Sequence, residues 1–161
     1  MKRVAFIYPG QGSQTVGMGQ DLYQEYDRIK QLFETANERL GYDLTSIMFN
    51  GPKEQLTKTE NTQPALLLVS AAITQLLAEE NIKPVVTGGH SLGEYSSLVT
   101  ADAISFSDAV LLVHERGKLM ERAYPEGKGS MAAVLGMDKD TLESELVKIS
   151  QDLNEVIEIA T

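Results

Sequence analysis

The spacing of apolar residues at the start of the chain predicts a strand followed by a helix. Residues 3–8 predict a short strand, because an apolar run follows Arg3 and stops at Pro9-Gly10. Residues 27–40 place apolar side chains three or four positions apart and precede Gly41, which predicts an amphipathic helix. The predicted buried face consists of Ile29, Leu32, Phe33, Ala36 and Leu40. Residues 51–62 are polar and predict a connection.

The middle of the chain predicts a second strand between two helices. Residues 64–80 are apolar almost all round, which predicts a helix that is buried on most sides and has Pro64 at its first position. Residues 85–87 predict a short strand, which Gly88-Gly89 should end. A helix is expected to begin just after Ser91 and to run for about ten residues.

The remaining pattern predicts a long helix and then a small separate unit. Ser105 is a suitable N-cap for a helix that reaches about residue 123. Residues 124–129 read as a linker, and beyond it we expect a strand (131–135), a helix (138–150) and a strand (156–160). The alternation of strands and helices predicts an α/β fold. Because the chain stops within its last predicted strand, we expect it to be a truncated form.

Composition narrows the classes of protein that are compatible with this pattern. The 161 residues are 42% hydrophobic, enough for one globular domain with its own core. The net charge of -9 and the lack of a basic run argue against nucleic-acid binding. Without cysteine, the chain has no disulfide, thiolate zinc site or cysteine nucleophile, and we expect no metal. No apolar run is long enough to span a bilayer, so we expect a soluble, cytoplasmic protein without membrane partners.

The strongest chemical signal is the pentapeptide Gly89-His90-Ser91-Leu92-Gly93, which fits the pattern G-x-S-x-G. It lies between a predicted strand and a predicted helix, as a nucleophile elbow requires. Glycines on both sides allow a sharp turn that exposes the serine hydroxyl, and the N–H of Leu92 can stabilise an oxyanion at the start of the helix. The alternative is a glycine-rich turn that has no chemical role.

Neither histidine of the chain is a good candidate for the general base. His90 is adjacent to Ser91, and adjacent side chains in a tight turn point apart, so we assign it to packing around the elbow together with Gly89 and Gly93. His114 lies two residues before Arg116 on a helix and therefore on a different face. A serine nucleophile often takes its base from a distant position, which here would lie beyond the end of the chain.

Residues 10–19 form a loop with four glycines directly after the first predicted strand. The loop has Thr15 where a dinucleotide fingerprint needs its third glycine, and it lacks the Lys-Ser/Thr of a phosphate loop. It could instead direct the backbone N–H of Gln11 at the oxyanion. An ordinary glycine-rich turn is the alternative.

Arg116 lies on the predicted apolar face of the helix that Ser105 begins. That face consists of Ala109, Leu112, Val113, Leu119 and Met120. A guanidinium there needs a partner, because burial of an unpaired charge costs several kcal/mol. The partner is either an internal carboxylate or the carboxylate of a substrate, which the planar fork of arginine binds through two hydrogen bonds.

In this order, the motifs resemble those of the malonyl-CoA:acyl carrier protein transacylase family. The matching segments are Gly10-Gln11-Gly12-Ser13-Gln14, Asn61-Thr62-Gln63-Pro64-Ala65, Gly89-His90-Ser91-Leu92-Gly93-Glu94-Tyr95-Ser96, Arg116-Gly117-Lys118-Leu119-Met120 and residues 129–134. The resemblance implies that Ser91 forms a malonyl-serine ester, that Gln11 and Leu92 supply the oxyanion-hole amides, and that Arg116 binds the malonyl carboxylate. Leu92 resembles the malonyl-selective members. No cofactor is implied, since the partner carries the phosphopantetheine.

The resemblance also implies a fold and two parts. Residues 1–124 would be the N-terminal part of an α/β-hydrolase-like subdomain with an incomplete parallel sheet. Residues 125–161 would be the first strand, helix and strand of a ferredoxin-like subdomain. The family's general-base histidine lies in a second half that this sequence does not contain, so we expect the chain to be inactive alone and to self-associate through strands that lack neighbours.

Two other functions share these motifs. A serine hydrolase or thioesterase uses the same elbow, and acyltransferase domains of polyketide synthases share the whole set. The expected partners of a transacylase are malonyl-CoA and acyl carrier protein, which is acidic by family. Lys118, Arg122 and Lys128 are candidates to bind the carrier, with an ordinary solvated surface as the alternative.

Overall fold

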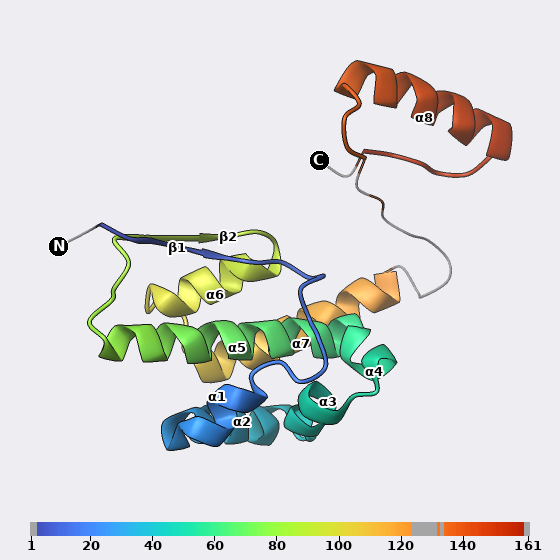
Figure 1. Ribbon diagram of the computed structural model, residues 1–161. Helices are drawn as coiled ribbons and strands as arrows, with labels where there is room; N and C mark the ends of the chain where they lie inside the picture. The colour runs from blue at the N-terminus through green and yellow to red at the C-terminus, as the bar shows by residue number, and fades with distance from the viewer. Residues whose placement is uncertain (1–2, 124–131, 133, 160–161) are drawn as a thin grey trace. The chain divides into compact units, whose positions relative to one another are not determined.

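The computed structural model describes residues 3–123, 132 and 134–159. The chain divides into two compact units, residues 1–126 and residues 127–161, and each is described by itself. The first unit contains both strands and seven of the helices labelled in Figure 1, and the second contains α8. The described part is therefore a helix-rich α/β structure with a small parallel sheet, as the pattern predicts at the level of class.

The sheet of the first unit pairs two strands that are far apart in the sequence. β1 (Ala5–Tyr8) and β2 (Val86–Gly89) run parallel, with Tyr8 opposite Gly89. The prediction that Gly88-Gly89 ends the second strand is wrong, since both glycines pair within it. Pairing uses only backbone groups, and the missing side chains leave room for the turn that follows. The sheet thus delivers the chain directly to Ser91.

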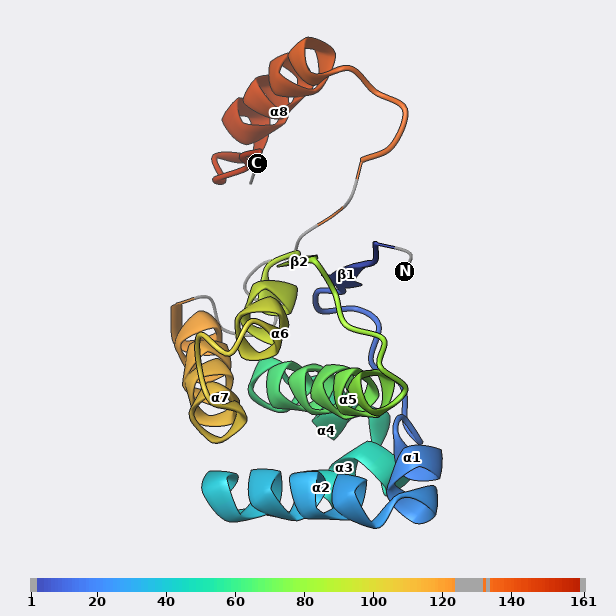
Figure 2. The same ribbon diagram turned by 90° about the vertical axis from the view of Figure 1, so that its left-hand side faces the viewer.

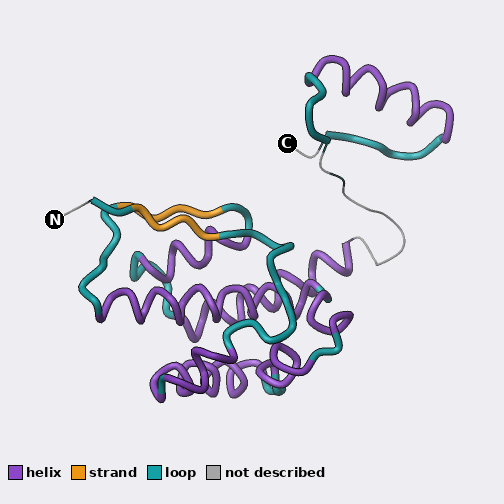
Figure 3. The backbone as a smooth tube through the Cα atoms, viewed as in Figure 1, coloured by secondary structure: helices purple, strands orange, loops and turns teal. Residues whose placement is uncertain are grey.

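Seven helices accompany this sheet among the described residues of the first unit, and α6 contacts both strands. They are α1 (Gln20–Glu25), α2 (Asp27–Leu40), α3 (Leu44–Asn50), α4 (Lys53–Thr57), α5 (Thr59–Glu79), α6 (Leu92–Thr100) and α7 (Phe106–Ala123). In both views α5 lies between the layer of the strands and α2 (Figures 1 and 2), and the backbone tube distinguishes the helices from the short strands (Figure 3). The predicted bounds of α2 are confirmed, with Ile29, Phe33 and Ala36 buried and Gly41 as a left-handed C-cap.

The prediction of a polar connection over residues 51–62 is wrong, because α4 and the first turn of α5 occupy it. Two side chains explain how a polar segment is buried. Thr62 Oγ1 donates to the carbonyl of Leu56, and Asn61 Nδ2 donates to the carbonyl of Gln55 over 2.9 Å. The side chains therefore satisfy carbonyl groups at the end of α4, which a helix leaves without internal partners.

Pro64 lies inside α5, so the prediction that it occupies the first position of this helix is wrong. Proline has no N–H, so the carbonyl of Glu60 loses its partner within the helix. The ring of His114 on α7 replaces that partner, with Nδ1 2.9 Å from the Glu60 oxygen. A proline inside the helix is thus tolerated because another helix satisfies the carbonyl group.

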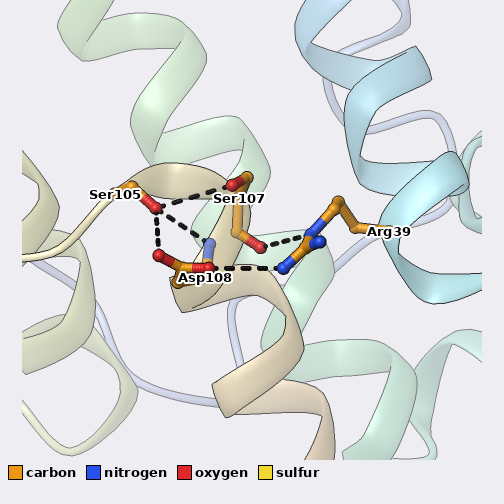
Figure 4. A network of polar contacts seen from close by, with 4 residues as sticks. All are labelled: Arg39, Ser105, Ser107 and Asp108. Atoms are coloured by element: carbon orange, nitrogen blue, oxygen red, sulfur yellow. Dashed lines mark hydrogen bonds and ion pairs between the residues drawn. The ribbon is translucent and has the colours of Figure 1, made fainter.

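α7 begins as predicted, with the hydroxyl of Ser105 accepting a hydrogen bond from the N–H of Asp108 over 3.1 Å. Figure 4 shows how this turn is tied to α2: Arg39 Nε donates to the carbonyl of Ser107 over 3.0 Å, and Nη2 to Asp108 Oδ1 over 3.3 Å. Ser105 also donates to Asp108 Oδ2. These contacts fix the N-terminal end of the helix that carries Arg116.

The buried face of α7 differs in part from the predicted one. The buried residues are Ala109, Val110, Val113 and Gly117, whereas Leu112, Leu119 and Met120 are exposed by 47%, 60% and 44%. Gly117 explains why the buried face differs from the predicted one, because a Cβ atom there would lie 2.7 Å from the backbone of Thr59 and Glu60. α7 therefore turns its small residues toward α5, where the backbones approach most closely.

The second unit contains one helix, α8 (Lys139–Leu153), close to the predicted bounds. Asp138 caps it by accepting a hydrogen bond from the N–H of Thr141 over 2.9 Å. The predicted strands are not found where the structure describes their residues, at 134–135 and 156–159. A strand needs a neighbour for its backbone groups, and no pairing of these residues is seen within the described part of the second unit. The predicted linker at 124–129 lies outside the described residues.

Candidate active site

Ser91 occupies the sharp turn between β2 and α6, as the G-x-S-x-G pattern predicts. Its backbone has φ 54° and ψ -105°, a strained conformation for a residue with a side chain. A Cβ atom at Gly89 would lie 2.1 Å from the carbonyl group of Gly93, and one at Gly93 would lie 2.2 Å from the oxygen of Tyr8. The turn therefore requires glycine at both flanking positions, and it holds the serine in a fixed orientation.

Backbone hydrogen bonds connect this turn to the sheet and to the helix. The N–H of His90 donates to the carbonyl of Tyr8 over 3.3 Å, and the N–H of Gly93 donates to the carbonyl of His90 over 2.9 Å. Leu92 is buried and opens α6, so its N–H has no acceptor within the helix. That N–H, at the positive end of the helix dipole, suits an anionic group beside Ser91.

The guanidinium of Arg116 reaches from α7 to the serine. Its Nη2 donates to Ser91 Oγ over 3.0 Å, and its Nη1 donates to Gln63 Oε1 over 2.9 Å. Its Cζ atom lies 5.6 Å from the centre of the Tyr95 ring, within range of a cation–π contact. The structure thus brings Ser91 and Arg116 together. Of the two partners considered for Arg116, the internal carboxylate is not found, because no ion pair among the described residues includes this arginine.

Sequence reasoning missed Gln63 as part of this site. Its side chain is 1% exposed on α5, one residue before Pro64. Its Nε2 lies 3.2 Å from the sulfur of Met120 while its Oε1 accepts from Arg116. A buried glutamine in an otherwise apolar helix was the available signal, because such a side chain must find partners.

The contacts of the two histidines do not involve the serine hydroxyl. His90 is exposed, and its ring flanks Gly10, where an added Cβ would lie 2.8 Å from Nδ1. His114 bonds to the carbonyl of Glu60, and its ring centre lies 5.6 Å from that of Tyr42. Neither makes a hydrogen bond with Ser91. The expectation that His90 packs around the elbow stays a prediction.

The loop that carries Gln11 lies beside the elbow. Gly10 approaches the carbonyl of His90, from which an added Cβ would be 3.0 Å away. Gln11 itself is exposed, and its Nε2 contacts Thr59 Oγ1 over 3.4 Å. Within the described ranges, no group of three or more His, Asp or Glu side chains could hold a metal ion, and no helix is long and apolar enough to cross a membrane.

Comparison with known proteins shows which family the chain belongs to. The family model described as an acyl transferase domain matches residues 5–156. The chain belongs to the acyl transferase family. The resemblance drawn from the motifs is confirmed by the relatives of this acyl transferase chain. This chain is 49% identical over 154 residues to a malonyl CoA-acyl carrier protein transacylase of Bacillus subtilis (strain 168). The aligned residues cover 96% of this chain and 49% of the relative. A transacylase of Staphylococcus aureus (strain MRSA252) is 49% identical over 160 residues.

Solved structures give the same family and fold. An acyl carrier protein S-malonyltransferase from Vibrio cholerae superimposes with a TM-score of 0.84 and 44% identity, covering 93% of this chain and 49% of that one. A malonyl-transacylase solved in complex with a type II polyketide acyl-carrier protein gives 0.86 and 43%, covering 94% and 49%. The acyl transferase chain therefore shares the α/β fold of these enzymes and spans about half of their length.

Proposed function

We propose that this chain supplies the nucleophile and the carboxylate-binding arginine of a malonyl-CoA:acyl carrier protein transacylase of fatty acid biosynthesis. The observation that carries the proposal is the 3.0 Å contact between Arg116 and Ser91, beside a strained strand-to-helix turn. A hydroxyl alone would suit any acyl group. The added guanidinium suits an acyl group that bears a carboxylate of its own.

The reaction proceeds in two half-reactions at Ser91. The hydroxyl oxygen attacks the thioester carbon of malonyl-CoA, its proton passes to a base, and the CoA thiolate leaves, which produces a malonyl-serine ester. The phosphopantetheine thiol of acyl carrier protein then attacks the ester and releases the serine. The amides of Leu92 and Gln11 stabilise the oxyanion of each tetrahedral intermediate, and Gly89, His90 and Gly93 maintain the turn.

The proposal extends to a finer description of the fold. Residues 1–124 form the α/β-hydrolase-like part, whose parallel β1–β2 pair and following α6 are the elements that an elbow needs. Residues 125–161 belong to a ferredoxin-like part, of which α8 is the described helix. The transacylases named above are the relatives on which the malonyl-CoA substrate and the carrier protein partner are proposed.

The base for the first proton transfer comes from outside the contacts that the structure describes. His90 and His114 are the two histidines of the chain; His90 is exposed, His114 bonds to the carbonyl of Glu60, and neither makes a hydrogen bond with Ser91. We therefore infer that the chain alone binds malonyl-CoA but turns it over slowly. Rapid transacylation by the purified chain would contradict this inference.

Binding of two CoA esters to the purified chain tests the proposal without turnover. By calorimetry, malonyl-CoA should bind at least about tenfold more tightly than acetyl-CoA, because a partly desolvated charge pair contributes more than about 1.4 kcal/mol. Equal affinities would exclude a role of Arg116 in recognition of the acyl group.

Prolonged incubation with malonyl-CoA followed by peptide mass spectrometry tests the nucleophile. We expect the malonyl group on Ser91, no label in Ser91→Ala, and an unchanged label in Ser46→Ala, which alters an exposed serine. A label on another residue contradicts the assignment. A serine hydrolase or thioesterase remains the second candidate, since the same elbow serves it. CoA release that is independent of added carrier protein would favour that function.

A further inference from the structure

Gln63 holds the substrate-facing arginine through an amide whose orientation is determined by its neighbours. A guanidinium has only donors, so the atom of Gln63 that faces Arg116 Nη1 at 2.9 Å must be the oxygen. The amide nitrogen then points to the sulfur of Met120 at 3.2 Å. Both ends of this buried side chain are thus occupied, and its acceptor is directed at the guanidinium.

Every contact of the guanidinium within the described residues is with a neutral group. These groups are the amide oxygen of Gln63, the hydroxyl of Ser91 and the ring of Tyr95. None of the ion pairs formed by the described residues includes Arg116. Neutral partners position the fork but leave its positive charge uncompensated, and a carboxylate in the same place would have neutralised it.

We propose that Gln63 is a specificity-determining residue, which selects acyl groups that carry a carboxylate by holding Arg116 through a neutral acceptor. This inference rests on the function proposed above. An anionic acyl group gains a full charge–charge interaction on arrival, because no internal carboxylate competes for the guanidinium. An uncharged acyl group gains nothing from it. The selectivity for malonyl over acetyl thus depends on the neutrality of Gln63 as well as on the charge of Arg116.

The decisive variant is Gln63→Glu, which keeps the size and the acceptor but adds a negative charge. The affinity of the purified chain for malonyl-CoA, measured by calorimetry, should fall at least about tenfold, while the affinity for acetyl-CoA should change less than about threefold. Gln75→Glu is the matched control, because Gln75 is an exposed residue of the same helix and the variant has the same net charge. It should leave both affinities unchanged.

Gln63→Met separates neutrality from shape. This variant is neutral and of similar length but has no acceptor, so the preference for malonyl should decrease less than about threefold. Thermal unfolding and circular dichroism check that both variants fold. Should Gln63→Glu not fold, Gln63→Met decides alone: abolition of the preference by this neutral side chain overturns the proposal.

Two further results would also overturn it: an unchanged preference in Gln63→Glu, or equal losses in Gln63→Glu and Gln63→Met, which would show a purely structural role. Failure of the proposed function itself has a different signature. In that case the unmodified chain would already bind the two esters equally.

Discussion

Arg116 Nη2 donates a hydrogen bond to Ser91 Oγ over 3.0 Å, although Ser91 lies in the turn before α6 and Arg116 lies on α7. The contact places a positive charge beside the hydroxyl that would become an ester. In malonyl-CoA, one methylene separates the carboxylate from the thioester carbon, so a carboxylate-binding group must lie close to the nucleophile. The short distance between the two side chains meets that requirement.

Replacement of Arg116 by lysine should weaken the binding of malonyl-CoA at least about tenfold, or about 1.4 kcal/mol. Lysine keeps the charge but cannot hold Gln63 and a carboxylate with one planar fork. Calorimetry with malonyl-CoA and acetyl-CoA measures the effect, and acetyl-CoA should bind as before. Full retention of malonyl binding would show that only the charge of Arg116 matters.

Two adjacent glycines should respond differently to alanine. Gly89→Ala places a Cβ 2.1 Å from the carbonyl group of Gly93, whereas the nearest atom to a Cβ at Gly88 is 3.6 Å away, at the end of Ile7. We expect Gly89→Ala to lower the free energy of unfolding by more than about 3 kcal/mol and Gly88→Ala to change it by less than about 1 kcal/mol. Urea denaturation of both variants gives the comparison, and similar losses would contradict the account of the turn.

The contact between His114 and Glu60 should depend on Pro64. His114→Phe leaves the Glu60 carbonyl without its donor and should cost about 1–3 kcal/mol. Pro64→Ala restores an N–H that can bond to that carbonyl within α5, so the same histidine substitution should cost less in the Pro64→Ala background. A double-mutant cycle by urea denaturation measures the coupling. Strictly additive effects would mean that the histidine does not replace the missing N–H.

Tyr42 should make stability fall at alkaline pH. Burial raises the pKa of its hydroxyl above the ordinary value near 10, with a smaller contribution from the charge of Glu60. The unfolded chain therefore loses this proton at a lower pH than the folded chain, and the stabilisation is full below pH 10 and is lost progressively above it. The free energy of unfolding from pH 8 to 11 should decline more steeply for the unmodified chain than for Tyr42→Phe. Parallel curves would contradict the shift.

The local pattern was sufficient for the elements whose stability is mostly local. The face of α2, the caps at Gly41 and Ser105, and the elbow at Ser91 follow from periodicity, cap chemistry and two glycines. The same reasoning failed for residues 51–62, where polar side chains suggested exposure. The side chains of Asn61 and Thr62 bond to carbonyl groups of α4, and the ring of His114 bonds to the backbone carbonyl of Glu60. Only the folded chain brings these groups together.

The candidate site shows the same division. Ser91, Arg116, Gln11 and Leu92 were predicted from motifs, whereas Gln63 was not, because its contact with Arg116 depends on which residue of α7 faces it. The buried face of α7 differs from the predicted face for a related reason. Gly117 permits the backbone of α7 to approach that of α5 closely, and the spacing of apolar residues does not encode this backbone distance.

By itself, the sequence determined that a strained, glycine-flanked serine would begin a helix and that an arginine would lie on a later one, because turn and helix preferences act over a few residues. The tertiary structure decided that the guanidinium meets the hydroxyl, that neutral groups hold it, and that a proline can lie inside α5. Those outcomes depend on contacts between α5, α6 and α7, which form only when the helices pack and exclude water.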